Sequence, residues 1–150
     1  MKTKYPVSMR SYALVLIQVL ALGYLAYSGP IRTEHIEFQI WQLSGLFLAI
    51  SALVGLNWHS FSVFPEPKPK GRFVQGGVYA FIRHPMYAGV LIVFGSLVWE
   101  FFSWDRLLAL CVLLLVFVFK ILDEERLLKA RFPEYRTYCE NTNRLIPFVW

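Results

Sequence analysis

The sequence has little of what soluble folds and metal sites depend on. Charged residues make up only 17% of the 150 residues, and there are two cysteines and three histidines. Cys111 stands in an apolar block and Cys139 near the C-terminus, without metal-type spacing or an obvious disulfide partner, so both are interpreted as packing residues. His35 and His59 have no partners at ligand spacing, so no metal site is expected. The motifs GxGxxG, HExxH and GxSxG and the Walker lysine loop are all absent.

The chain has instead a large share of apolar residues, and they occur in long blocks. It is 57% hydrophobic and 17% aromatic, with a mean hydropathy of +0.48, more apolar surface than a soluble domain of this size can bury. The four blocks cover residues 11–27, 38–57, 86–102 and 107–121. A perpendicular membrane span needs roughly 20 residues. We therefore expect an all-α integral membrane protein with about four transmembrane helices, folded as a single domain over residues 1–150.

Small residues and prolines mark special positions in this pattern. The small residues Ser51, Gly55, Gly89, Gly95 and Ser96 are expected to allow close contact between helices. The connection at residues 64–71 is proline-rich and is predicted to be extended. Residues 75–77 are predicted to form a turn.

The placement of charge indicates an orientation in the membrane. The net charge is +5; residues 1–10 and the connection 58–83 are basic, whereas the connections 28–37 and 100–106 are slightly acidic. By the positive-inside rule, both termini and the connection 58–83 are cytosolic. The modest length favours a prokaryotic inner membrane. No basic face of a soluble domain is visible, so no nucleic-acid partner is expected. Alternatively, the first block is a cleavable signal peptide, although its apolar run is longer than a usual signal core.

The strongest local signal lies at the start of the third block. Pro85 forces His84 out of the α region and suits the first turn of a helix, so His84 is predicted to be the N-cap. A helix N-terminus with Arg83 and His84 beside it offers donors to an anionic group. The alternative is that Arg83 only extends to lipid headgroups and His84 only caps the helix.

The second signal lies where the fourth block ends. Lys120 and Glu124 are one helical turn apart, and three consecutive acids, Asp123 to Glu125, begin what we predict to be an amphipathic cytosolic segment. In this segment Pro133 is predicted to open a further helical turn. A local Lys120–Glu124 ion pair is the simple explanation, but ionisable residues at a membrane exit are functional candidates. Because blocks three and four form a hairpin, residues 84 and 124 should be neighbours and could enclose a zwitterionic ligand.

Together these two signals resemble a known family. Arg-His-Pro-x-Tyr-x-Gly at residues 83–89 is followed by Glu-Glu at 124–125 and then by Phe132, Tyr135, Tyr138, Arg144 and Pro147. This combination resembles the isoprenylcysteine carboxyl methyltransferase and phospholipid methyltransferase family. The resemblance covers residues 71–147. It implies that these residues form the cofactor-binding core.

The resemblance implies methyl transfer from S-adenosylmethionine to a lipophilic acceptor at the cytosolic membrane face. The acceptor is a carboxylate such as isoprenylcysteine or a lipid amine, and the partners are this lipophilic or lipid-modified substrate and membrane lipids. The residues implied to bind the cofactor are Val74, Tyr79, Arg83, His84, Pro85, Met86, Tyr87 and Glu124.

Two further residues are implied to act on the acceptor. Lys120 falls where the carboxyl methyltransferases place a substrate-facing arginine, and lysine lacks the planar fork that grips a carboxylate in two places. Glu125 is the candidate base for an amine acceptor. The alternative functions are an NADPH-dependent membrane reductase of the sterol type and a non-catalytic membrane adaptor, which would bind neither cofactor.

Overall fold

The computed structural model describes residues 6–56, 60–68 and 71–147, so the expectations placed on Asn57, His59 and Lys70 lie outside the described residues. These residues form helices and no strand, so the all-α prediction is confirmed. The elements are α1 (Met9–Tyr27), α2 (Ile36–Gly55), the short 3-10 helix η1 (Gly77–Ala80), α3 (Pro85–Glu100), α4 (Trp104–Arg131) and α5 (Tyr135–Asn141).

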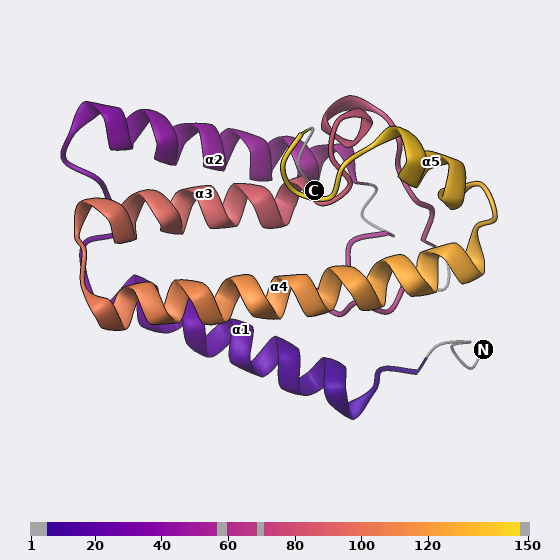
Figure 1. Cartoon of the computed structure of the whole chain (residues 1–150), viewed down its shortest axis with the longest axis horizontal. Helices are drawn as coiled ribbons and strands as arrows, with labels where there is room; N and C mark the ends of the chain where they lie inside the picture. Colours follow the sequence, from indigo (N-terminus) through magenta and orange to yellow (C-terminus); the bar gives the residue numbers. More distant parts are fainter. Residues whose placement is uncertain (1–5, 57–59, 69–70, 148–150) are drawn as a thin grey trace.

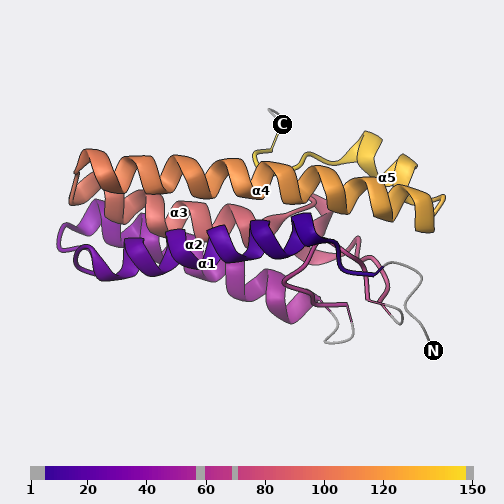
Figure 2. The same cartoon turned by 90° about the horizontal axis from the view of Figure 1, so that it is seen from below.

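The long helices lie side by side in an elongated bundle, with α3 between α2 and α4 in Figure 1. The main contacts are α2 against α3 and α1 against α4. Leu25, Leu113 and Phe117 form the buried core on the α1–α4 side. The tight α3–α4 connection lies at one end; the loop before η1, the helix α5 and the C-terminal segment all gather at the other (Figures 1 and 2).

Among the described residues, two helices are long and apolar enough to cross a membrane. They are α1 and α2, of 19 and 20 residues, and only 22% and 11% of their apolar windows is buried within the protein. A helix in the core of a soluble protein would be mostly buried. The apolar side chains that face outward include Leu16, Leu20 and Phe47. Such a surface indicates a membrane protein.

Helix α4 corrects one sequence prediction. It runs unbroken for 28 residues, so Asp123, Glu124 and Glu125 lie within the helix and begin no new segment. Residues 104–131 contain no glycine or proline, and nothing therefore stops the helix where the apolar block ends. The helix does end at Phe132, directly before Pro133. A further helix follows Pro133, as predicted, and carries Tyr135 and Tyr138.

The helices α2 and α3 touch through two glycines. A Cβ atom added to Gly89 would lie 2.6 Å from the carbonyl oxygen of Gly45 and 2.8 Å from the nitrogen of Ala49. The predicted role of Gly89 in close helix contact is thus confirmed. Gly95 faces open space and has no such role, and the sequence analysis missed Gly45.

We expect Gly89→Ala to lower the free energy of unfolding by about 1–3 kcal/mol, because the added methyl group would meet the backbone of Gly45 and Ala49 and the Cβ of Ala49, and no flexible side chain that could move away. Chemical unfolding in mild detergent measures the change. Gly95→Ala is the matched control in the same helix, and it should leave stability unchanged or raise it slightly. Equal stability of the two variants would contradict the proposed glycine contact.

Candidate functional site

A cavity of about 110 Å³ opens at the end of the bundle that holds the loop and α5. Its walls come from the loop before η1, from the junction of η1 and α3, and from the second half of α4 with α5. All eight residues that the sequence analysis assigned to a cofactor line it: Val74, Tyr79, Arg83, His84, Pro85, Met86, Tyr87 and Glu124. Lys120 and Glu125 do not line it.

The start of α3 forms one wall. His84 is the N-cap, with a non-helical backbone, and Pro85 occupies the first helical position. The side chain of His84 makes no capping hydrogen bond. Its Nδ1 lies 3.8 Å from Oε2 of Glu124, and its Nε2 lies 3.4 Å from Oε1 of Glu125. The predicted proximity of residues 84 and 124 is therefore confirmed.

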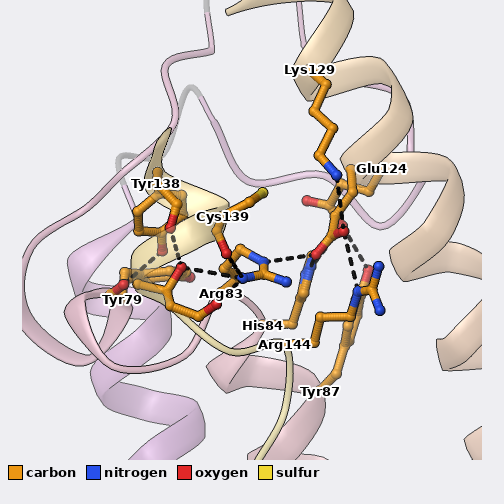
Figure 3. A network of polar contacts seen from close by, with 11 residues as sticks. Tyr79, Arg83, His84, Tyr87, Glu124, Lys129, Tyr138, Cys139 and Arg144 are labelled. Atoms are coloured by element: carbon orange, nitrogen blue, oxygen red, sulfur yellow. Dashed lines mark hydrogen bonds and ion pairs between the residues drawn. The ribbon is translucent and has the colours of Figure 1, made fainter. Parts of the chain in front are cut away.

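The carboxylate of Glu125 lies at the centre of a buried ion-pair network. Figure 3 shows its partners Arg83, His84 and Arg144 close to one another. It accepts hydrogen bonds from Nε of Arg83 at 2.8 Å and from Nε of Arg144 at 3.2 Å. Burial by itself raises the pKa of Glu125, but hydrogen bonds from His84 and Arg83 and the charge of Arg83 lower this pKa to about 2. A carboxylate held so firmly as the anion is a weak base, which argues against the role predicted for Glu125.

The guanidinium of Arg83 is engaged within the protein. Its Nη1 donates to the carbonyl oxygen of Cys139 at 3.1 Å and also to that of Thr142. Its side chain is only 7% exposed, so neither a free anion-binding group nor an extension to lipid headgroups describes it. Sequence reasoning missed this role because the partners include backbone carbonyls, which leave no pattern in the side chains.

The C-terminal segment is thereby fixed against the start of α3. The backbone N–H of Arg83 donates to the carbonyl of Asn143 at 2.7 Å, and that of His84 donates to the carbonyl of Arg144 at 3.0 Å. Figure 3 shows Cys139 and Tyr138 on the same side of the network as Arg83. Helix α5, which precedes this segment, lines the cavity through Tyr135 and Tyr138.

Aromatic side chains form the adjoining wall. The ring of Phe73 lies 5.2 to 5.8 Å from those of Phe132, Tyr135 and Tyr138, measured between centroids. The hydroxyl of Tyr138 donates to the carbonyl of Tyr79 at 2.6 Å. Burial raises the pKa of Tyr138 to about 12, so the hydroxyl stays protonated and remains a donor at neutral pH.

Among the described residues, Glu124 is one of two acidic residues that line the cavity, and the other lies in the loop before η1. The side chain of Glu124 is 33% exposed, and its Oε2 accepts a hydrogen bond of 3.4 Å from the hydroxyl of Tyr87. Burial raises the pKa of Glu124, against the opposing charges of His84 and Lys120. The ring of Tyr87 is stacked between His84 and Phe117, at centroid distances of 5.8 and 4.6 Å. The cavity thus combines two carboxylates with aromatic faces and a helix N-terminus.

Lys120 lies beneath the cavity, and only 1% of it is exposed. Its Nζ donates to Oε1 of Gln18 at 2.5 Å and to the carbonyl of Val63 at 2.7 Å. The local ion pair with Glu124 that the spacing suggested is not formed. Gln18 stands out in the sequence as a polar residue in the middle of the apolar block 11–27, but the sequence does not predict that Lys120 is its partner.

Comparison with known proteins adds a family. A family model described as phospholipid methyltransferase matches residues 39–135, from α2 to the start of α5. The match includes every cavity residue assigned from the sequence. The comparison with curated proteins found no match.

We expect Glu125→Gln to lower the free energy of unfolding at neutral pH by about 3 kcal/mol, because Arg83 keeps its buried charge and loses its partner. The pKa of Glu125 is lowered on folding, so its contribution is complete above the ordinary value of 4.5 and is lost as the pH falls toward about 2. The difference between wild type and variant, measured by unfolding in detergent, should shrink over this range. A difference independent of pH would contradict the ion-pair network.

Proposed function

Since the chain belongs to the phospholipid methyltransferase family, we propose that it transfers a methyl group from S-adenosylmethionine to a lipophilic acceptor. The observation that carries the proposal is the cavity, which gathers residues from Val74 to Glu124 around one space.

The residues present fit this cofactor group by group. The first turn of α3 offers the backbone N–H groups of Met86 and Tyr87, which precede the first intrahelical bond, from Ala88 to His84. Such groups suit the cofactor's carboxylate. Glu124 suits its amino group or its ribose hydroxyls, and the aromatic wall around Phe73 suits its adenine ring.

When bound, the cofactor supplies an electrophilic methyl group on a sulfonium centre. The chain's own contribution is to hold and orient: Glu124 accepts hydrogen bonds, α3 donates them, and the aromatic wall excludes water. Glu125, with its low pKa, is not proposed as a base. Lys120 has its donors engaged with Gln18 and Val63, so it offers little to an acceptor carboxylate. This favours a lipid amine over an isoprenylcysteine carboxylate as the acceptor.

We further propose a multi-pass arrangement with the cavity at the cytosolic face. The described part of the loop before α3 carries Lys68, Arg72 and Arg83, which suits the cytosolic side. In this arrangement α1, α2, α3 and the apolar half of α4 cross the membrane, and both termini lie on the cytosolic side. The whole chain then acts as one domain, and a prokaryotic inner membrane remains the setting we expect.

The function is tested by incubating purified protein with radiolabelled S-adenosylmethionine and a total lipid extract. We expect label in a lipid product, identified by chromatography and mass spectrometry. Saturable binding of a reduced dinucleotide, without binding of S-adenosylmethionine, would replace the proposal with a reductase. Binding of neither cofactor would leave a non-catalytic adaptor.

The cofactor site has its own test. We expect Glu124→Gln to raise the Kd for S-adenosylmethionine about tenfold, because a charged acceptor of hydrogen bonds becomes neutral. Isothermal titration in detergent measures the change. Glu134→Gln removes one exposed carboxylate next to α5 and is the matched control, expected to leave the Kd unchanged. Equal affinities in both variants would remove Glu124 from the site.

A further inference from the structure

We propose that Lys120 is a positioning residue: it holds a loop over the cavity and so sets the affinity for the cofactor, without contacting the acceptor. The inference rests on the proposed function. We call residues 60–68 and 71–74 the roof loop, because all of them except Val63 line the cavity.

The roof loop depends on bonds from outside itself. Pro65 and Pro67 have no backbone N–H. Within the described loop, three backbone N–H groups bond to other residues of the loop: Phe64 to Ser62 Oγ, Arg72 to Ser60 Oγ and Gly71 to the carbonyl of Lys68. These bonds join the loop to itself, and its attachment to the helices comes from side chains of other elements. An extended segment without such bonds would lose its order at little cost.

Three side chains from two helices supply these bonds. Lys120 in α4 donates to the carbonyl of Val63, the hydroxyl of Ser11 in α1 donates to Glu66 at 2.5 Å, and Arg131 in α4 donates to the carbonyl of Lys68 at 2.6 Å. Lys120 is the most deeply buried of these donors. A charged donor on a carbonyl away from water makes a stronger bond than the same pair in water.

The geometry at Val63 sets it apart from the rest of the roof loop. Its side chain is 42% exposed and points away from the cavity lining, while its carbonyl is turned inward to the ammonium of Lys120. The hydrogen bond from Lys120 therefore holds the roof loop at Val63, a residue that does not line the cavity. The neighbours Ser62 and Phe64 are held in the lining as a result.

The other contacts of Lys120 leave it nothing for a substrate. An ammonium has three protons. Two are directed to Val63 and Gln18, and Nζ also lies 5.4 Å from the centroid of the Tyr87 ring, a cation–π distance. Tyr87 lines the cavity, and so does Glu124 one turn along α4. Lys120 therefore acts through the groups around the cavity.

Loss of this bond should weaken cofactor binding more than turnover. A free roof loop has to be ordered when the cofactor binds, and that ordering reduces the affinity. Once the cofactor is bound, the loop is in place and the reacting groups are unchanged. The expected signature is a raised KM for S-adenosylmethionine with a nearly constant kcat.

The experiment compares three variants of the full chain in detergent. Lys120→Met removes the bonds to both Gln18 and Val63; Gln18→Met removes only the first; Arg126→Met is the control, because it removes a more exposed cation of α4. Two readouts are taken: backbone hydrogen exchange over residues 60–68 without cofactor, and KM and kcat for S-adenosylmethionine.

We expect Lys120→Met to speed exchange over residues 60–68 about tenfold and to raise KM about tenfold, with kcat within about threefold of wild type. Gln18→Met and Arg126→Met should stay near wild type in both readouts. Equal effects of Lys120→Met and Gln18→Met would reduce Lys120 to a link between α1 and α4 and overturn the proposal. A fall in kcat with unchanged exchange would also overturn it, since that result places Lys120 on the acceptor.

Two provisions keep the outcome decisive. If Lys120→Met does not fold, Lys120→Arg is measured in its place. Arginine keeps a donor for the carbonyl of Val63, so we expect hydrogen exchange over the roof loop to be no faster than in Gln18→Met. Faster exchange in Lys120→Arg would overturn the proposal. If no methyl transfer is detected, the proposed function fails, but hydrogen exchange still shows whether Lys120 holds the loop. The two failures are thereby distinguishable.

Discussion

The buried carboxylate of Glu125 is the constraint on which the cavity depends. A negative charge within α4, only 2% exposed, is stable only with opposite charge and hydrogen bonds around it. Arg83 and Arg144 supply both, and they come from segments on either side of α4 in the sequence. By satisfying Glu125, they hold the start of α3, the C-terminal segment and α4 together, and the start of α3 and the second half of α4 are two walls of the cavity.

Much of this arrangement could be read from the sequence, and the reasons are physical. Pro85 marks the start of α3, and a three-residue connection between α3 and α4 forces their other halves to run side by side. Proximity of His84 and Glu124 follows from these two facts. A chain segment in lipid has to satisfy its backbone hydrogen bonds internally, so a long apolar block is expected to form a helix.

What the sequence could not supply is the partner of each polar side chain. Lys120 has Glu124 at helical spacing, yet it bonds to Gln18 and Val63, which lie far away in the chain. An ion pair between neighbours on one helix stabilises a fold by little. A buried ammonium instead donates hydrogen bonds to whichever acceptors lie within reach, here Gln18 and Val63. The continuous course of α4 does not follow from the apolar pattern for another reason. The change from apolar to charged residues after residue 121 marks the end of the apolar block, but it does not end the helix, which continues to Arg131 because no glycine, proline or cap interrupts it.

The unbroken α4 has a mechanical consequence. At 1.5 Å per residue, its 28 residues form a rod of about 42 Å, and in the arrangement proposed above one half lies in lipid while the other carries Glu124. Helices respond to a thinner or thicker bilayer by tilting. Because α4 has no hinge, a tilt of its membrane half in this arrangement also tilts its second half, so Glu124 moves relative to α3. The width of the cavity is thereby coupled to the thickness of the surrounding lipid.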